Sequence, residues 1–166
     1  MQQHNLQQRR SRYVHLTAGA TCTNTTGTFS GTLSDGGAIS CATGSQQDVW
    51  YKFTATEVTN GIYLNGVQGL NHGLEIRQGS CSGTVIACKN DTFGGSAENY
   101  FGNNFIVGQE YYIRVFNATA QLTTASFTIC IMKFPPPAND LCSNAIQLTP
   151  GNITCTLTQG SLSGAS

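Results

Sequence analysis

Apolar and polar residues alternate strictly along residues 48–55, the stretch that contains the only tryptophan of the chain. One face of this stretch is apolar and carries Val49, Tyr51, Phe53 and Ala55. Trp50 lies on the opposite face, together with Lys52 and Thr54. A period of two residues is typical of a half-buried β-strand. The pattern predicts a central strand around which the other strands of a sheet are arranged.

Shorter segments with strand character recur along the chain, separated by Gly, Asn and Ser. They lie at residues 26–33, 61–67, 74–78, 84–89, 105–107, 111–116 and 126–132. No stretch shows the period of a helix. Seven or eight strands at this spacing predict an all-β fold, an antiparallel β-sandwich.

Three regions differ in composition. Residues 1–15 are rich in Gln and Arg and form an irregular segment, whereas residues 16–134 hold the predicted strands. Three consecutive prolines then begin region 135–166, where they act as an extended linker.

The end of the chain repeats its beginning. The Leu-Thr-x-Gly motif at residues 16–19 returns at residues 148–151, and Cys22 has its counterpart in Cys155. A repeat of this length indicates tandem domains, with a second copy that starts after the prolines. Nothing near residues 5–15 matches residues 139–146, so the first copy lacks the opening of the second.

Charge and hydropathy exclude several classes of function. Charged residues make up 10% of the chain and the formal net charge is zero. Three basic residues cluster near the N-terminus, but no basic stripe follows, so nucleic acid is not an expected partner. No apolar run is long enough for a membrane span. The polar N-terminus is no signal peptide, so we expect a piece of a longer precursor.

Seven cysteines without metal-ligand spacing predict a disulfide framework in an oxidising compartment. Cys81 and Cys88 flank a short turn and are the predicted local pair. Cys142 and Cys155 are a candidate pair in the second copy. Cys22 pairs with Cys41 or accepts a partner from another chain, and the partner of Cys130 stays open.

Several motifs can be taken together. They are residues 139–146 (NDLCSNAI), the 48–55 stretch, residues 79–83 (GSCSG), residues 87–91 (ACKND), residues 111–115 (YYIRV) and residues 127–130 (FTIC). The set resembles a repeat of large secreted surface proteins of Bacteroidota, which resemble adhesins exported by type IX secretion. It is also similar to bacterial pre-peptidase C-terminal domains. The resemblance covers nearly all of residues 16–166 and implies a jelly-roll-like sandwich that is extracellular and non-catalytic.

Two kinds of ligand site are conceivable, and each has a simpler alternative. Asp91, Asn90 and Asp48 are candidate oxygen ligands for Ca²⁺, but no loop has calcium spacing, and Asn90 with Asp91 is more typical of a turn cap. We therefore expect no cofactor. Trp50 and Tyr112 lie opposite the core faces of their strands, so they are candidates for a glycan site or a subunit interface.

The sequence predicts no enzyme, because it contains no nucleophile elbow, phosphate-binding loop or paired carboxylates. The leading hypothesis is a structural or adhesive repeat at a bacterial cell surface, whose partners are neighbouring repeats or other copies. A second hypothesis is a filament subunit, in which Leu141, Ile146 and Leu148 of one tail complete the next sandwich by strand addition. A third is a carbohydrate-binding module of a secreted hydrolase, with surface glycans as partners.

Overall fold

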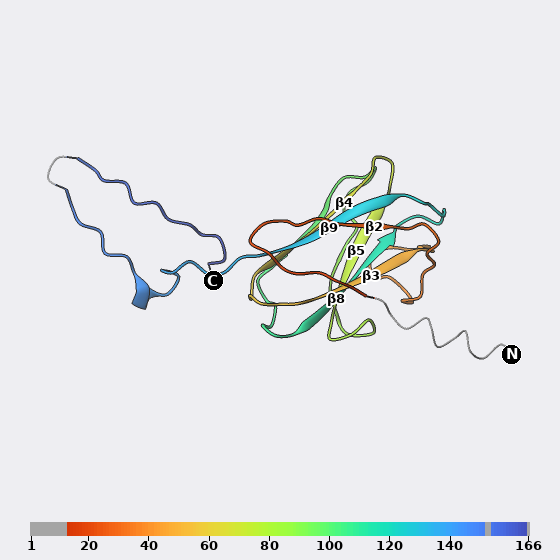
Figure 1. Cartoon of the computed structure of the whole chain (residues 1–166), viewed down its shortest axis with the longest axis horizontal. Helices are drawn as coiled ribbons and strands as arrows, with labels where there is room; N and C mark the ends of the chain where they lie inside the picture. The colour runs from red at the N-terminus through yellow and green to blue at the C-terminus, as the bar shows by residue number, and fades with distance from the viewer. Residues whose placement is uncertain (1–12, 152–153, 166) are drawn as a thin grey trace.

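The computed structural model describes residues 13–151 and 154–165, and their regular structure is almost entirely β (Figure 1). The strands are β1 (Val14–His15), β2 (Thr25–Thr28), β3 (Asp48–Thr54), β4 (Asn60–Gly66), β5 (His72–Gln78), β6 (Val85–Lys89), β7 (Glu98–Gly102), β8 (Glu110–Asn117) and β9 (Ser126–Lys133). One turn of 3-10 helix, η1 (Cys142–Asn144), lies in the tail. None of the described residues form a helix that is long and apolar enough to cross a membrane.

The strands form two sheets that pack face to face. The five-stranded sheet has the order β1-β3-β8-β5-β6, and the four-stranded sheet has the order β2-β9-β4-β7. Strand β1 runs parallel to β3, whereas the other paired strands are antiparallel. The predicted antiparallel, jelly-roll-like β-sandwich is confirmed.

The core lies between the inner faces of the two sheets. In β3, the apolar face predicted from alternation points inward, with Tyr51 and Phe53 buried and Val49 packed against them. The ring of Phe53 stacks on Tyr111 of β8 at 5.6 Å between centroids, and Phe105 completes this group. Apolar burial of this kind is the main favourable contribution to folding.

Three details of the sequence prediction are wrong. The centre of the larger sheet is β8, not β3, because β3 is flanked on its other side only by the two residues of β1. The segment around Phe105 is a loop, where the amide of Phe105 donates to the carbonyl of Val58. Strand β7 was missed, since it contains only two aromatic residues among polar ones and ends in Gly102.

The N-terminal segment closes one side of the sandwich. Residues 1–12 lie outside the described residues, so the predicted irregular segment 1–15 is described only from Tyr13 onward. After β1 the chain crosses to the other sheet, where Gly19 bridges Met132 of β9. The disulfide Cys22–Cys130 holds the segment there.

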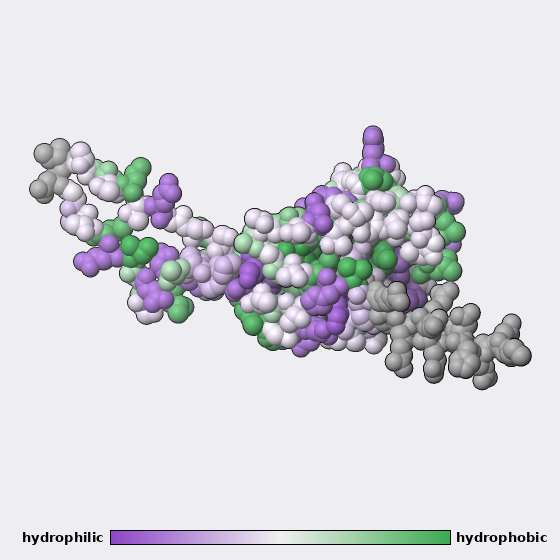
Figure 2. All heavy atoms as spheres, in the orientation of Figure 1, coloured by the Kyte–Doolittle hydropathy of each residue, from purple (hydrophilic) through white to green (hydrophobic). Residues whose placement is uncertain are grey.

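The tail that follows β9 leaves the sandwich and runs as an open loop away from it (Figure 1). Its hydrophobic side chains are exposed to solvent (Figure 2). The predicted strand donors Leu141, Ile146 and Leu148 are among them. In this structure they form no strand with the sandwich, because the described part of the tail contains only the turn of 3-10 helix.

Candidate functional site

A long segment between β2 and β3, residues 29–47, covers the outer face of the five-stranded sheet. The disulfide Cys41–Cys88 attaches its middle to the edge strand β6. At Gly36 the backbone lies so close to the sheet that an added Cβ would come within 2.6 Å of the guanidinium carbon of Arg114 and 2.7 Å of the Trp50 ring. Only glycine fits at such an approach. We call residues 29–47 the cover segment.

The side chain of Arg114 holds the cover segment from below. It projects from the middle of β8 and is completely buried. Its Nη2 and Nε atoms lie 2.6 and 2.7 Å from Oδ2 of Asp48 on β3. It also donates to the carbonyl oxygens of Gly36 and Gly37 at 3.2 and 3.0 Å and to Oγ of Ser34 at 2.8 Å. A buried charge with this many partners is stabilising only while all of them are present.

A second buried carboxylate lies beside Arg114 and Asp48 beneath the cover segment. We call these charged side chains and their partners the polar layer. Glu75 on β5 is buried, and its Oε1 lies 2.6 Å from Nη2 of Arg77. Its Oε2 accepts from both the amide and the hydroxyl of Ser40 in the cover segment at 3.2 Å. Nη1 of Arg77 in turn donates to the carbonyl of Cys81. Two charged side chains from the middle of strands, Arg114 and Glu75, therefore bind the cover segment.

Trp50 is part of the same layer. Its Nε1 donates to Oδ1 of Asp35 at 3.1 Å. The guanidinium carbons of Arg114 and Arg77 lie 5.5 and 6.0 Å from its ring centre, in the range of cation–π contacts. Trp50 is half-buried, with the cover segment and two guanidinium groups packed against its ring, so the predicted role in a glycan site or an interface stays a prediction for its exposed part.

Tyr112 lies on the same outer face and is also covered. It is 8% exposed, and its hydroxyl donates to Oε2 of Glu110 at 3.2 Å. The ring of Tyr13 packs edge-on against it, with centroids 5.1 Å apart. The prediction that Tyr112 is open to a ligand is therefore wrong. Alternation placed both aromatic residues on the outer face, but it does not show that an outer face is exposed.

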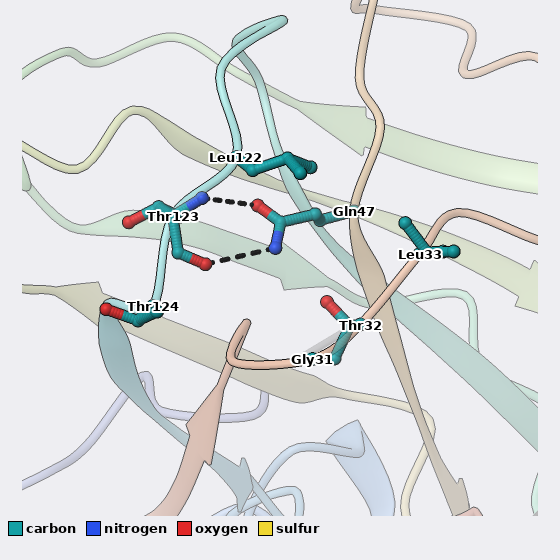
Figure 3. Close-up of a pocket in the computed structure, with 7 residues that line it drawn as sticks. All are labelled: Gly31, Thr32, Leu33, Gln47, Leu122, Thr123 and Thr124. Carbon is teal, nitrogen blue, oxygen red and sulfur yellow. Dashed lines mark hydrogen bonds between the residues drawn. The ribbon is translucent and has the colours of Figure 1, made fainter.

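An open hollow lies where the cover segment meets the loop between β8 and β9. It has a volume of about 540 Å³ and is lined by Gly31, Thr32, Leu33, Gln47, Leu122, Thr123 and Thr124 (Figure 3). No charged residue is among them. Leu33 and Leu122 are largely exposed, so this site presents apolar side chains next to threonine hydroxyls.

Gln47 forms the floor of this hollow. Its Nε2 donates to the carbonyls of Phe29 and Thr123 at 2.8 and 3.0 Å. Its Oε1 accepts from the amide of Thr123 and from Nδ2 of Asn117 at 2.8 and 3.2 Å (Figure 3 shows the contacts to Thr123). A buried amide with all these bonds fixes the two loops relative to each other. The hollow therefore has a rigid floor, and its rim combines apolar side chains with hydroxyl groups. Such a lining suits a neutral ligand.

The candidate calcium ligands are not brought together. Asp48 is bound to Arg114 inside the sheet, whereas Asp91 pairs with Lys89 at 2.9 Å on the surface. The side chain of Asn90 donates to the carbonyl of Cys41. Within the described ranges, no three His, Cys, Asp or Glu residues group in a way that would hold a metal ion.

The predicted disulfide between Cys81 and Cys88 is wrong. Cys88 lies opposite Glu75 in the β5–β6 pair, away from the turn that contains Cys81, and it bonds to Cys41 instead. The alternative pair Cys22–Cys41 is also wrong, since Cys22 bonds to Cys130 on β9. The predicted pair Cys142–Cys155 is not formed, and both thiols are exposed. Cys81 is free and half-buried.

Sequence reasoning missed the Arg114 layer and the hollow. A signal for the first was present: in a chain with few charges, Glu75, Arg77 and Arg114 all lie inside strands. Charges at such positions indicate buried pairing, because an unpaired charge is costly to bury. The hollow had no comparable signal, because its two loops meet only in the folded chain.

Comparisons with known proteins agree with this architecture. A family model described as galactose binding domain-like, and named for association with type IX secretion, matches residues 10–129. No curated protein is significantly similar in sequence.

Three solved structures are partly similar to this chain. The pre-peptidase C-terminal domain of Bacillus anthracis collagenase has a TM-score of 0.49 at 11% identity, over 74% of this chain and 97% of that one. PliG, the Aeromonas hydrophila inhibitor of g-type lysozyme, has a TM-score of 0.44 at 15% identity, over 72% and 96%. The Podospora anserina GH26-CBM35 mannanase has a TM-score of 0.35 at 10% identity, over 70% and 29%. On the extent of the family match, this chain belongs to the galactose binding domain-like family associated with type IX secretion.

Proposed function

We propose that this chain is a non-catalytic structural or adhesive unit of a secreted bacterial surface protein that carries several such units in tandem. The family match and the disulfides support a secreted setting. The buried charges Asp48, Glu75 and Arg114 hold the cover segment in place, which is a structural role.

The observation that carries the proposal is a pair of equivalent leucines. Leu16 begins the repeated Leu-Thr-x-Gly motif in the sandwich, where it is 4% exposed and its amide donates to the carbonyl of Lys52. Leu148 begins the same motif in the tail and is 67% exposed. The tail thus contains the counterpart of a core residue, but no sheets that could bury it. This is expected for the start of a second unit.

The test reads the coding sequence that follows residue 166 in genomic DNA. Cys155 corresponds to Cys22, whose partner Cys130 lies 108 residues further along the chain. We expect a cysteine at about this distance after Cys155, in a strand that resembles β9. A downstream sequence that lacks strand periodicity and this cysteine would contradict the tandem arrangement.

A second candidate function is glycan binding in the hollow. Its neutral rim, with Leu33 and Leu122 beside threonine hydroxyls, offers apolar contact for a sugar ring and hydrogen bonds for its hydroxyl groups. The family description is consistent with such a role.

The second test is a glycan array with the intact chain, followed by titration of any hit. Leu122→Ala should weaken binding, because it removes an apolar wall of the hollow. Ile106→Ala is the matched control, since this exposed side chain does not line the hollow. An array without any hit, or equal losses in both variants, would rule out binding at the hollow.

A further inference from the structure

Cys81 has no partner in the first unit, and the two disulfides of that unit show why. Cys22–Cys130 and Cys41–Cys88 use four of its five cysteines. The half-buried Cys81 lies in the turn after β5, where its carbonyl accepts from Arg77. Tyr13 lies close enough to influence the pKa of this thiol, and its ring packs against Tyr112, which is paired in the sheet with the same Arg77. The N-terminal segment therefore runs directly beside this thiol.

The tail shows which cysteine is missing beside Cys81. Cys142 lies six residues before Leu148, and the residue six positions before the equivalent Leu16 is Arg10. Position 10 is only three residues from Tyr13, a distance of about 10 Å in extended chain. Three residues of chain are therefore long enough for a cysteine at this place in a unit to be brought to Cys81, where a disulfide needs a Cα separation of about 4.4–6.8 Å.

The strand next to this place is short. β1 pairs only two of its residues with β3, Val14 with Tyr51 and His15 with Lys52. In the repeat alignment, Ile146 and Gln147 correspond to Val14 and His15. The tail segment of residues 139–148, which we call the opening segment, therefore carries the counterparts of both β1 residues and, four residues before the first of them, Cys142.

We propose that Cys81 is the acceptor for the cysteine of an opening segment, and that in this chain the donor is Cys142 of a second copy. In each copy, the sandwich has the acceptor Cys81 but no opening cysteine of its own. The tail of the same copy has the opening cysteine Cys142 but no acceptor. The tail extends away from its own sandwich with Cys142 exposed (Figure 1). Copies of the chain then join head to tail, each contact leaving one free acceptor and one free donor.

The bond forms by oxidation with a disulfide such as oxidised glutathione. The two thiols lose two protons and two electrons and become one S–S bond, and one glutathione disulfide is reduced to two molecules of glutathione. In a protein with a complete second unit, the same rule pairs Cys142 with the cysteine that follows the fifth strand of that unit. The proposal rests on the proposed function only in taking residues 139–151 as the start of a second unit.

The test incubates the purified full chain in a glutathione redox buffer at increasing protein concentration. Non-reducing gels should show a ladder that grows with concentration, and peptide mapping should identify a Cys81–Cys142 cross-link between chains. Cys81→Ser and Cys142→Ser should each abolish the ladder. Cys155→Ser is the matched control, because it removes another exposed tail thiol and should leave the ladder intact.

Other cross-links would overturn the proposal. A ladder built on Cys142–Cys142 or Cys155 bonds, a Cys81–Cys142 bond confined to monomers, or chains that remain reduced at all three thiols would each do so. The cross-link is measured on this chain alone, whereas the tandem arrangement is read from the gene, so the failure of one is distinguishable from the failure of the other.

Discussion

Leu16 and Leu148 begin the same motif, yet one is buried in the sandwich and the other is exposed in the tail. The sandwich surrounds Leu16 with β3 and β9, whereas the described tail residues have no sheet to pack against. The difference shows that this motif has no structure of its own. Its apolar residue is buried only when strands from distant parts of a unit are present, because short strands are stable only within a larger sheet.

The largest effect should come from the polar layer that only the sandwich has. Arg114→Ala leaves Asp48 buried without its partner and releases the cover segment, which should lower the free energy of unfolding by about 3–5 kcal/mol. Denaturant unfolding measures this loss. Lys89→Ala, which removes an exposed ion pair with Asp91, should change stability little. Equal effects in the two variants would mean that the layer is not stabilising.

The next largest difference should be between the stability effects of substituting Leu16 and Leu148. Leu16→Ala should destabilise the sandwich by about 2–5 kcal/mol through lost burial and a cavity. Leu148→Ala should stay within about 0.5 kcal/mol in this chain, because the side chain is exposed. Thermal and denaturant unfolding of the two variants measures both values. A large cost at Leu148 would show that the tail packs on a sandwich in solution.

A cysteine placed at position 10 should make the first unit complete. Arg10→Cys should bond to Cys81 and stabilise the sandwich by about 2–4 kcal/mol, because the new loop restricts the unfolded chain. Alkylation should then label Cys142 and Cys155 but not Cys81. The same substitution in a Cys81→Ser background should bring no gain. Retained labelling of Cys81 in the single variant would contradict the alignment of Arg10 with Cys142.

The smallest effect concerns the reactivity of Cys81. Burial raises the pKa of its thiol, and the hydrogen bond from Tyr13 opposes part of this shift. The thiolate is the reactive form, so alkylation of folded Cys81 at neutral pH should be slower than in the denatured chain, and the difference should shrink as pH rises through the raised pKa. Tyr13→Phe should slow the reaction further. Identical pH profiles for the folded and denatured chain would refute the burial effect.

The strands could be predicted because their signal is local. Alternation identified β3, β8 and β9 with small errors at their ends, and the inward faces were assigned correctly. Strand β7 was missed and Phe105 was misplaced, because their structure depends on neighbours and not on a periodic pattern.

The candidate site could not be predicted, because its contacts join distant parts of the chain. Arg114 and Asp48 are 66 residues apart, and Gln47 contacts Thr123 across 76 residues. The short spacing of Cys81 and Cys88 suggested a local bond, but the antiparallel register of β5 and β6 separates them. The partial cover over Trp50 has the same origin, since the cover segment that packs on it is a loop without periodic signal.

The sequence by itself determined the all-β class, the inward faces of the main strands and the Leu-Thr-x-Gly motif that Leu16 and Leu148 share. Each of these follows from residue type and spacing along a single stretch of chain. Only the tertiary structure decided the disulfide partners, the partial cover over Trp50, the burial of Tyr112, and the place of Cys81 beside Tyr13. Those features depend on loop paths and strand order, which bring together residues that have no relation in sequence spacing.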